Sequence, residues 1–419
     1  MFPFLPYPPD DGGRIGFFNP IKYLSRKSEL SVVCLTEEKD EGASIEELRK
    51  FCVELRTYQR PTGHDNYRLA KGAVFSPPGS AAKYWHPAVG GLIREIAERR
   101  GAEVVEFHHL NTAIYRRYAG DRPVMLREHN VEYKVWERFA ESADTLRQRV
   151  YGRWSAPRVR TYEAKAAVSF DRCVVVTPTD AEHLRAVAPE ARIEVIPSGV
   201  DTEYFCPADE VEEEPFSITI TGSFDWKPKQ RSLAVLLTDV FPRIRAKENR
   251  AKLYVVGKGV PENLRRVAEG TLGVKVIGAV PDVRPYVWRS SLVINYLESG
   301  GGIALKVLEA MMMRKAVLTN ALGCEGLQVQ HGRTIFVADG AEKFAEAAAR
   351  LLVDQSLRRR LAESASETAM ELYSWHAVAG RFQAAYEEMI EEAREKKSAM
   401  ELTRAGHHGV ESAITRAGD

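Results

Sequence analysis

The stretch LVINYLESGGGIALKVLEA, residues 292–310, decides the fold class of this chain. Its apolar, β-branched start at 292–296 predicts a buried strand, and the pattern that follows the loop predicts a helix running on through Met313. Between them, Gly300, Gly301 and Gly302 let the backbone approach a ligand closely. The amino end of the helix offers free N–H groups to a diphosphate. A strand, a glycine loop and a helix in this order are typical of a nucleotide-binding unit in a parallel sheet.

Two side chains near the start of this helix have chemistry that suits nucleotide binding. Lys306 and Glu309 are three residues apart, so they lie on one face of the helix. A lysine can neutralise phosphate charge, and a carboxylate can accept hydrogen bonds from vicinal ribose hydroxyls. The alternative interpretation is a glycine-rich turn with a surface ion pair.

Short apolar runs alternate with longer helical patterns on both sides of this stretch, which predicts βαβ units and parallel sheets. In the first half we expect strands at 30–35, 104–107, 124–127, 173–176 and 193–196. In the second half we expect them at 218–221, 253–256, 274–277, 292–296, 316–319 and 334–337. The chain is therefore predicted to be an α/β protein with two doubly wound, Rossmann-like domains.

The domain boundary is predicted from composition. The acidic stretch PADEVEEEP at 207–215 separates an expected first domain, 1–206, from a second, 216–375. We expect a last helix at 376–397 and a tail without regular structure at 398–419. Ligands of open parallel sheets bind at the carboxyl ends of the strands, so we expect the site in a cleft between the domains.

Composition excludes several classes of protein. A formal net charge of +1 over 419 residues gives no global field for nucleic acid. Five scattered cysteines without a Cys-x-x-Cys pair argue against a zinc cluster or a disulfide framework, and a reducing cytosol fits them. The start resembles no signal peptide, and no apolar run is long enough to span a bilayer. We expect a cytoplasmic protein that is able to touch a membrane surface.

Dinucleotide oxidoreduction is the first chemistry to be rejected. Gly257-Lys258-Gly259 is the nearest match to a Rossmann fingerprint, and it lacks the third glycine. We interpret it as a tight turn after a strand. Sugar transfer from a nucleotide and epimerisation of a nucleotide sugar remain open for this outline.

The segment 298–310 resembles the donor-binding element of the retaining family-4 glycosyltransferases, which have the GT-B fold. It is most similar to a bacterial exopolysaccharide-associated subgroup with the pattern G-x-x-x-K-V-L-E-A-M. The wider family has two glutamates eight residues apart; the second matches Glu309, but the first falls on Gly301. Glu298 is a candidate substitute for it near the donor sugar, and a solvated loop carboxylate is the alternative.

Two further segments of the second half fit the same resemblance. Residues 221–229, TGSFDWKPK, resemble the subgroup's G-S-M-D-W-x-P-N stretch. The resemblance implies that Gly222 and Ser223 approach the donor and that Lys229 contacts its diphosphate, with Lys227 as the second choice. The segment 196–205, IPSGVDTEYF, is similar to the family's P-N-G-V-D-x-x-x-F, which we interpret as structural.

In the first half, PPDDGGR at 8–14 resembles the family's first glycine-rich loop. The resemblance implies that Gly12 and Gly13 admit the ligand and that Arg14 pairs with phosphate. It also places His129, in the segment LREHNVEY at 126–133, near the reacting sugar carbon. There a neutral imidazole would hydrogen-bond a sugar hydroxyl; the alternative is a structural histidine.

The resemblance implies transfer from a UDP- or GDP-sugar to a glycan or lipid-linked acceptor with retention, in the synthesis of cell-surface polysaccharide or glycoconjugate. No Asp-x-Asp occurs in the sequence, so we expect no metal and no cofactor besides the donor. His129, Lys229 and Lys306 are the expected catalytic residues.

Basic and aromatic residues at 146–165 suit a membrane surface or a lipid-diphosphate acceptor, or else a solvated helix pair. Two alternatives to sugar transfer stay open: the chain binds a nucleotide sugar without turnover, or it is a non-hydrolysing 2-epimerase of a UDP-sugar.

Overall fold

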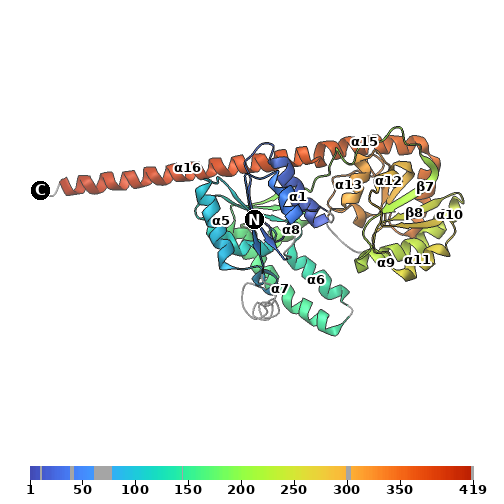
Figure 1. Cartoon of the computed structure of the whole chain (residues 1–419), viewed down its shortest axis with the longest axis horizontal. Helices are drawn as coiled ribbons and strands as arrows, with labels where there is room; N and C mark the ends of the chain where they lie inside the picture. Colours follow the sequence, from blue (N-terminus) through green and yellow to red (C-terminus); the bar gives the residue numbers. More distant parts are fainter. Residues whose placement is uncertain (10–11, 38–41, 61–77, 144, 299–302, 417–419) are drawn as a thin grey trace. The chain divides into compact units, whose positions relative to one another are not determined.

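The computed structural model describes residues 1–9, 12–37, 42–60, 78–143, 145–298 and 303–416. The chain divides into two compact units, and each has parallel strands covered by helices (Figure 1). Unit 1 comprises Met1–Ile196 and Ala379–Asp419, and unit 2 comprises Pro197–Val378.

Unit 1 contains two parallel sheets. Its strands are β1 (Ser31–Thr36), β2 (Glu54–Gln59), β3 (Val105–His108), β4 (Val124–Glu128), β5 (Arg172–Val175) and β6 (Ile193–Val195). β1 pairs with β2, and the other four lie in the order β3-β4-β5-β6. Every residue of β4 is buried, as expected for an inner strand covered on both faces.

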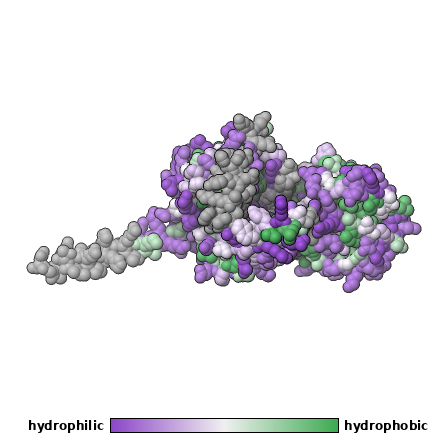
Figure 2. All heavy atoms as spheres, turned by 90° about the horizontal axis from the view of Figure 1, so that it is seen from below, coloured by the Kyte–Doolittle hydropathy of each residue, from purple (hydrophilic) through white to green (hydrophobic). Residues whose placement is uncertain are grey.

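The helices of unit 1 supply the rest of its core. They are α1 (Gly12–Leu24), α2 (Gly42–Arg49), α4 (Gly79–Ala82), α5 (Pro87–Arg99), the 3₁₀ helix η1 (Leu110–Ala119), α6 (Glu132–Ser142), α7 (Leu146–Ser169) and α8 (Pro178–Val187). Apolar residues of α5, η1, α7 and α8 pack with those of the sheet in one cluster. Figure 2 shows that hydrophilic side chains cover most of the face seen there, with apolar atoms in small groups.

Unit 2 is built on one six-stranded parallel sheet. Its strands are β7 (Glu214–Thr221), β8 (Lys252–Val256), β9 (Val274–Gly278), β10 (Ser290–Asn295), β11 (Val317–Thr319) and β12 (Phe336–Val337). They lie in the order β12-β11-β10-β7-β8-β9. The order reverses between β7 and β10, the neighbouring strands from which the chain winds outward in opposite directions. Ligands of doubly wound sheets bind at this point, beyond the carboxyl ends of the strands.

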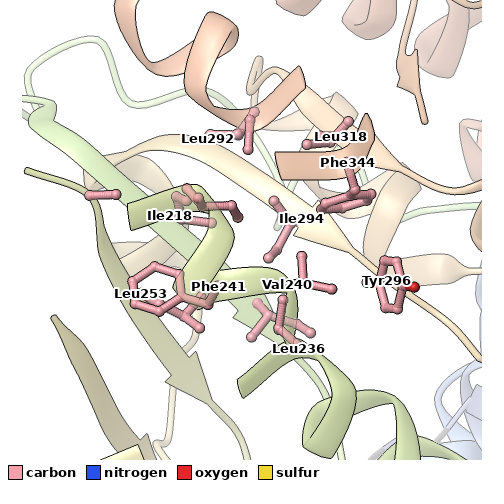
Figure 3. Packing of buried hydrophobic residues seen from close by; sticks show 14 of the residues in the cluster. Ile218, Leu236, Val240, Phe241, Leu253, Leu292, Ile294, Tyr296, Leu318 and Phe344 are labelled. Carbon is pink, nitrogen blue, oxygen red and sulfur yellow. The ribbon is translucent and has the colours of Figure 1, made fainter. Parts of the chain in front are cut away.

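Helices cover both faces of this sheet. They are α9 (Lys227–Val235), the π-helical turn η2 (Leu236–Val240), α10 (Phe241–Lys247), α11 (Glu262–Glu269), α12 (Arg284–Arg289), α13 (Leu305–Met312), the 3₁₀ turn η3 (Ala321–Cys324), α14 (Ala341–Val353) and α15 (Gln355–Tyr373). On one face Ile218 and Ile294 pack with Phe241 and Phe344 (Figure 3). Val293, the neighbour of Ile294 in β10, points the other way, into a cluster with α13 and α15.

The last helix, α16 (Trp375–Arg416), is shared by the two units. Its first residues belong to unit 2, where Trp375 is buried against Gly199. A Cβ at Gly199 would lie 2.6 Å from the Trp375 ring, so glycine is needed there for close packing. From Ala379 the helix belongs to unit 1, where Phe382 stacks on Arg127 and Tyr386 hydrogen-bonds Glu106.

The predicted strands are all present, with ends shifted by at most four residues. β2, of sequence ELRTYQ, has no counterpart in the prediction, because most of its residues are polar and it lies at the edge of a sheet. The structure also differs over 207–215: this acidic stretch lies within unit 2, where Glu213 pairs with Arg358 and Glu214 with Lys252. Glu213 and Glu214 therefore have partners, whereas Asp209, Glu210 and Glu212 are exposed. Helix α16 continues through most of the expected tail, as far as Arg416.

Candidate functional site

The site in unit 2 lies where β7 and β10 end and α9 and α13 begin. Lys306 is in the first turn of α13, and its ammonium lies 3.9 Å from where a Cβ on Gly222 would be. Gly222 directly follows β7, so the absence of a side chain leaves open space in front of this lysine. Lys229 is in the first turn of α9 and is near enough for its charge to act on Lys306.

The site holds two ammonium groups, those of Lys229 and Lys306, whose pKa values are both lowered. Burial, and then the charge of Lys229, lower the pKa of Lys306 to about 8, although Glu309 acts in the opposite direction. Burial raises the pKa of Glu309 to about 7, against the effect of Lys306. Burial also lowers the pKa of Lys229, while Asp225 opposes this shift. In the described part of the chain, no carboxylate lies within ion-pair distance of either ammonium. An anion bound between the two lysines would relieve their repulsion.

The loop that follows β7 is shaped by glycines of the next strand's loop. A Cβ on Gly257 would lie 1.6 Å from the Gly222 carbonyl oxygen, and one on Gly259 would lie 2.0 Å from the Asp225 carboxylate. Phe224 donates its backbone N–H to the Lys258 carbonyl, 2.8 Å away. The Ser223 hydroxyl donates to Asp225 at 2.7 Å. Gly257-Lys258-Gly259, expected only as a turn, therefore holds the Gly222 loop in place.

Sequence reasoning also missed the side chains that position the chain after β10. Asn320 accepts from the Leu297 N–H and donates to the Leu297 carbonyl, at 3.2 and 2.6 Å. The Ser232 hydroxyl of α9 accepts from the Glu298 N–H at 3.0 Å. Glu298 itself is exposed. A signal was available in principle, because an asparagine directly after strand β11 would lie at the same sheet edge as the predicted site.

In unit 1, helix α1 begins at Gly12, so Gly13 and Arg14 lie in its first turn. Gly13 is exposed and Arg14 is half-buried. The amino end of a thirteen-residue helix carries N–H groups without intrahelical partners, which suits an anion.

His129 directly follows β4 and has a neutral imidazole. Burial, followed by the charge of Arg127, holds the pKa of His129 well below its usual range. Its ring packs edge-on against Phe17 with centroids 4.4 Å apart. Its Nε2 is buried and has no hydrogen-bond partner among the described residues. The ring is therefore held in place while one nitrogen is available for a hydrogen bond.

The two neighbouring histidines already have partners. The His108 ring stacks on Phe2, with centroids 3.9 Å apart, and its Nε2 lies 3.3 Å from Glu106. The His109 Nε2 lies 3.1 Å from Glu132. Burial lowers the pKa of His109, but the Glu132 carboxylate outweighs this effect and the net shift is upward. These contacts assign both rings to the framework around His129.

Two buried carboxyl groups lie below the amino end of α6. Glu163 accepts from the backbone N–H groups of Glu132 and Tyr133, at 2.6 and 2.9 Å. Glu128, the last residue of β4, is its neighbour. Burial and their mutual repulsion raise the pKa of Glu128, and burial is also the main cause of the raised pKa of Glu163. One proton shared within this pair would remove the repulsion.

The structure thus brings Gly222, Ser223, Lys229, Lys306 and Glu309 together in unit 2. Glu298 lies beside them at the end of β10. Gly300, Gly301 and Gly302 lie outside the described residues. The other predicted site residues, Gly12, Gly13, Arg14 and His129, belong to unit 1.

Comparison with protein families gives one match for each half of the chain. Residues 22–204 match the model described as "Glycosyltransferase Family 4", and residues 215–354 match that described as "Glycosyl transferases group 1". Two curated relatives are more distant. An uncharacterized 44.6 kDa protein in the cps region of Klebsiella pneumoniae is 20% identical over 81% of this chain and 87% of its own. A phosphatidyl-myo-inositol mannosyltransferase of Mycolicibacterium smegmatis is 28% identical over 46% of this chain and 51% of its own.

Solved structures share the fold over nearly the whole chain. Sucrose-phosphate synthase from Thermosynechococcus elongatus superposes with a TM-score of 0.66 and 17% identity, covering 94% of this chain and 98% of that one. The Anabaena protein HepE, solved in complex with UDP and glucose, superposes with a TM-score of 0.62 and 11% identity. That match covers 90% of this chain and 96% of HepE.

Proposed function

Because the chain is a glycosyltransferase with the GT-B fold, as the sequence predicted, we propose that it transfers a sugar from a UDP- or GDP-sugar. The proposed acceptor is a glycan or a lipid-linked glycan, and the proposed outcome is retention at the anomeric carbon. The reaction is proposed to need neither a metal ion nor a cofactor besides the donor.

The observation that carries the donor proposal is the pair Lys229 and Lys306 in front of Gly222. A nucleoside diphosphate is a compact anion, and it would place negative charge where two partly buried ammonium groups lack carboxylate partners in the described structure. The amino end of α13 adds its dipole in the same place. Glu309, one turn further along α13, is proposed to accept hydrogen bonds from the ribose hydroxyls. The solved complex of HepE with UDP supports a nucleotide of this class.

The proposed chemistry uses the leaving group itself. The bond between the anomeric carbon and the diphosphate oxygen breaks, and the acceptor oxygen bonds to the same face of that carbon. The acceptor's hydroxyl proton passes to the departing diphosphate, whose charge Lys229 and Lys306 stabilise. A neutral His129 is proposed to hydrogen-bond a hydroxyl of the sugar through Nε2. Its low pKa supports this role, since a cationic ring would disfavour positive charge developing on the sugar.

The surface of unit 1 supports a lipid-linked acceptor. None of the described helices is both long and apolar enough to cross a membrane. The α6–α7 pair nevertheless exposes large apolar side chains beside Arg147, Arg149 and Arg153: Val135, Phe139, Leu146, Val150, Tyr151 and Trp154. Figure 1 draws the α6–α7 pair at the bottom of the picture, and Figure 2 shows the molecule from below. On that face, small groups of apolar atoms lie among hydrophilic ones. We propose that the pair contacts an anionic membrane surface.

Calorimetric titration with UDP and with GDP in EDTA tests the donor proposal. We expect one of them to bind in EDTA, and adding magnesium to leave the affinity unchanged. Binding of neither nucleotide, or binding only with magnesium, would overturn the proposal.

The same protein preparation separates the two other functions. A new epimer formed from UDP-N-acetylglucosamine without acceptor would identify a 2-epimerase. Nucleotide affinity without donor hydrolysis or transfer to a broad acceptor panel would identify a binding protein, a possibility that Gly301 raises because it replaces a family glutamate.

A further inference from the structure

The residues His129, Asn130 and Val131 connect β4 to α6 and carry the histidine of the proposed reaction. β4 ends at Glu128, and α6 begins at Glu132. The direction of the His129 ring therefore depends on how firmly both ends of this connection are held. Val131, at the end next to α6, makes no side-chain hydrogen bond to the first turn of the helix. The free N–H groups of that turn need acceptors from elsewhere in the chain.

Glu163 of α7 supplies these acceptors. Its oxygens Oε1 and Oε2 accept from the N–H groups of Glu132 and Tyr133, at 2.6 and 2.9 Å. Glu163 is buried, and the helix dipole favours a carboxylate at the amino end of α6. Figure 1 shows α6 and α7 side by side, and a Cβ on Gly152 of α7 would lie only 2.8 Å from that of Ala140 in α6. One side chain of α7 thus fixes the end of the connection next to α6.

The other end of the connection is held through Glu128. This last residue of β4 pairs with Val175 of β5, and its side chain is buried. Neither of its carboxyl oxygens accepts a hydrogen bond from a donor in the described part of the chain, so an ionised Glu128 would be poorly compensated. A proton on Glu128 instead allows its carboxyl group to donate to the Glu163 carboxylate. That hydrogen bond ties the end of β4 to the start of α6.

The surroundings of this pair are mostly acidic. The titratable groups that face it are Glu132 of α6, Asp180 of α8, Tyr162 of α7, Cys173 of β5 and His109 after β3. Burial and then the charge of Glu128 raise the pKa values of Tyr162 and Cys173, so both are neutral at pH 7. His109 lies 3.1 Å from Glu132 and chiefly compensates that carboxylate. A shared proton is therefore what removes the repulsion within the pair.

We propose that Glu163 and Glu128 are positioning residues for His129: they hold both ends of the connection from β4 to α6, so that the ring stays where it hydrogen-bonds the donor sugar. This inference rests on the proposed function of His129. Glu163 acts through its two backbone N–H bonds, and the proton on Glu128 keeps the Glu163 carboxylate from being repelled. A change in either residue should therefore displace the ring without weakening nucleotide binding in unit 2.

Glu163→Gln tests the positioning role by separating kcat from nucleotide affinity. A glutamine offers one acceptor oxygen, so the buried N–H of Glu132 or Tyr133 loses its partner. We expect kcat to fall roughly tenfold or more, while the calorimetric affinity for UDP or GDP changes by less than about twofold. Asp354→Asn is the control, since Asp354 accepts from the Leu357 N–H at 2.8 Å at the amino end of α15. Unchanged kcat in Glu163→Gln, or an equal fall in both variants, would overturn the proposal.

Glu128→Gln tests the role of the proton, because the amide keeps a donor to Glu163 at every pH. In the unaltered protein, Glu128 ionises as the pH rises, and repulsion then weakens the hold of Glu163 on α6. We expect the ratio of kcat in Glu128→Gln to kcat in the unaltered protein to be close to one at pH 7 and to increase several-fold by pH 9. Titration of Lys306 and of the substrates cancels in this ratio. A constant ratio would overturn the proposal, even if Glu163→Gln failed to fold.

NMR of the protein labelled with ¹³C-histidine observes the ring without any reaction. The signals of His129, assigned by their loss in His129→Gln, should shift in Glu163→Gln and stay unchanged in Asp354→Asn. Unchanged His129 signals in Glu163→Gln would contradict a positioning role. If the unaltered protein transferred no sugar, the proposed function would fail, while these signals would still decide whether the carboxyl pair positions His129.

Discussion

Lys229 and Lys306, in the first turns of α9 and α13, lie close enough for the charge of Lys229 to lower the pKa of Lys306. Two like charges held together in a partly buried place are unfavourable without a counter-ion. The two ammonium groups lie at the carboxyl ends of β7 and β10, where the sheet order reverses and where a ligand is expected. A bound anion would offset the repulsion between them there. This relationship is the basis of the prediction for Lys306 and of the predicted pH dependence.

Lys306→Ala should lower kcat by more than it raises the KM for the donor. The departing diphosphate carries more charge than the intact donor, so the lysine interacts more strongly with the transition state. A charged hydrogen bond contributes about 1.5–3 kcal/mol, which predicts a loss of roughly tenfold to a hundredfold. Steady-state kinetics with varied donor measures both constants. Lys275→Ala, at an exposed lysine of the same unit, is the control. A rise in KM at unchanged kcat would contradict the prediction.

Glu309→Ala should weaken binding of UDP or GDP by roughly tenfold to a hundredfold when no sugar is present. The ribose does not change during the reaction, so the loss should appear in the affinity for the free nucleotide. Calorimetry measures it, with Glu262→Ala on an exposed part of α11 as the control. Intact nucleotide binding with slowed transfer would instead place Glu309 at the reacting centre.

Nucleotide affinity should be highest between about pH 7 and pH 8. Lys306, with a pKa of about 8, loses its charge as the pH rises through that value, and phosphate binding needs the charged form. Glu309, with a pKa of about 7, becomes protonated as the pH falls and then accepts hydrogen bonds less well. Lys306→Met should remove the decline at high pH, and Glu309→Gln the decline at low pH. Titration of the nucleotide itself affects the unaltered protein and both variants alike. If both variants kept the pH profile of nucleotide affinity seen in the unaltered protein, Lys306 and Glu309 would not be the groups that titrate.

Glu128→Gln should stabilise the protein at pH 8 and have a smaller effect at pH 5. The folded-state pKa values of Glu128 and Glu163 are raised, so their contribution is favourable below the unfolded values near 4.5 and is lost as the pH rises. A glutamine cannot ionise, and it can donate to Glu163. We expect a gain of about 1 kcal/mol or more at pH 8, or roughly 2–4 °C in Tm. Exposed Glu98→Gln is the control; a gain that is equal at both pH values would contradict the pairing.

The double variant Leu146→Ser, Val150→Ser should bind anionic vesicles several-fold more weakly than the unaltered protein. Leu146 and Val150 are 74% and 59% exposed, so their apolar surface is available to a membrane, and the change should leave the core intact. Co-sedimentation with phosphatidylglycerol-containing vesicles measures the effect. Leu272→Ser, in unit 2, alters a side chain that is 77% exposed and should change nothing. If the unaltered protein, the double variant and Leu272→Ser sedimented equally with the vesicles, the proposed membrane contact of the α6–α7 pair would be wrong.

The sequence predicted the inner strands well because they are apolar on both faces, as in the VMLRE strand β4 and the SSLVIN strand β10. It did not predict β2, because most of its ELRTYQ residues are polar and the strand lies at an edge. Nor did it predict the boundary at Pro197, because the acidic residues at 207–215 looked solvated. Their partners, Arg358 and Lys252, lie 145 and 38 residues away in sequence.

Part of the site could likewise be predicted from local sequence. Gly222 follows β7 directly, and Lys306 and Glu309 belong to the helix after β10, so their place at the sheet edge could be inferred. Asn320 could not be recognised, because its role depends on Leu297, which is 23 residues away. The neutral state of His129 was predicted from family resemblance alone, whereas its physical causes, burial and Arg127, required the fold.

The shared helix α16 has a consequence for the order in which the protein folds during synthesis. The ribosome makes most of unit 1 first, then all of unit 2, and only then Phe382 and Tyr386, which pack on Arg127 and Glu106. Arg172 likewise receives its partner Glu388 late, at 2.8 Å. Unit 2 can therefore complete its packing before residues 379 onward are made, whereas unit 1, although begun earlier, must wait for those residues. A nascent chain stalled before residue 379 should be protease-resistant in unit 2 and sensitive in unit 1.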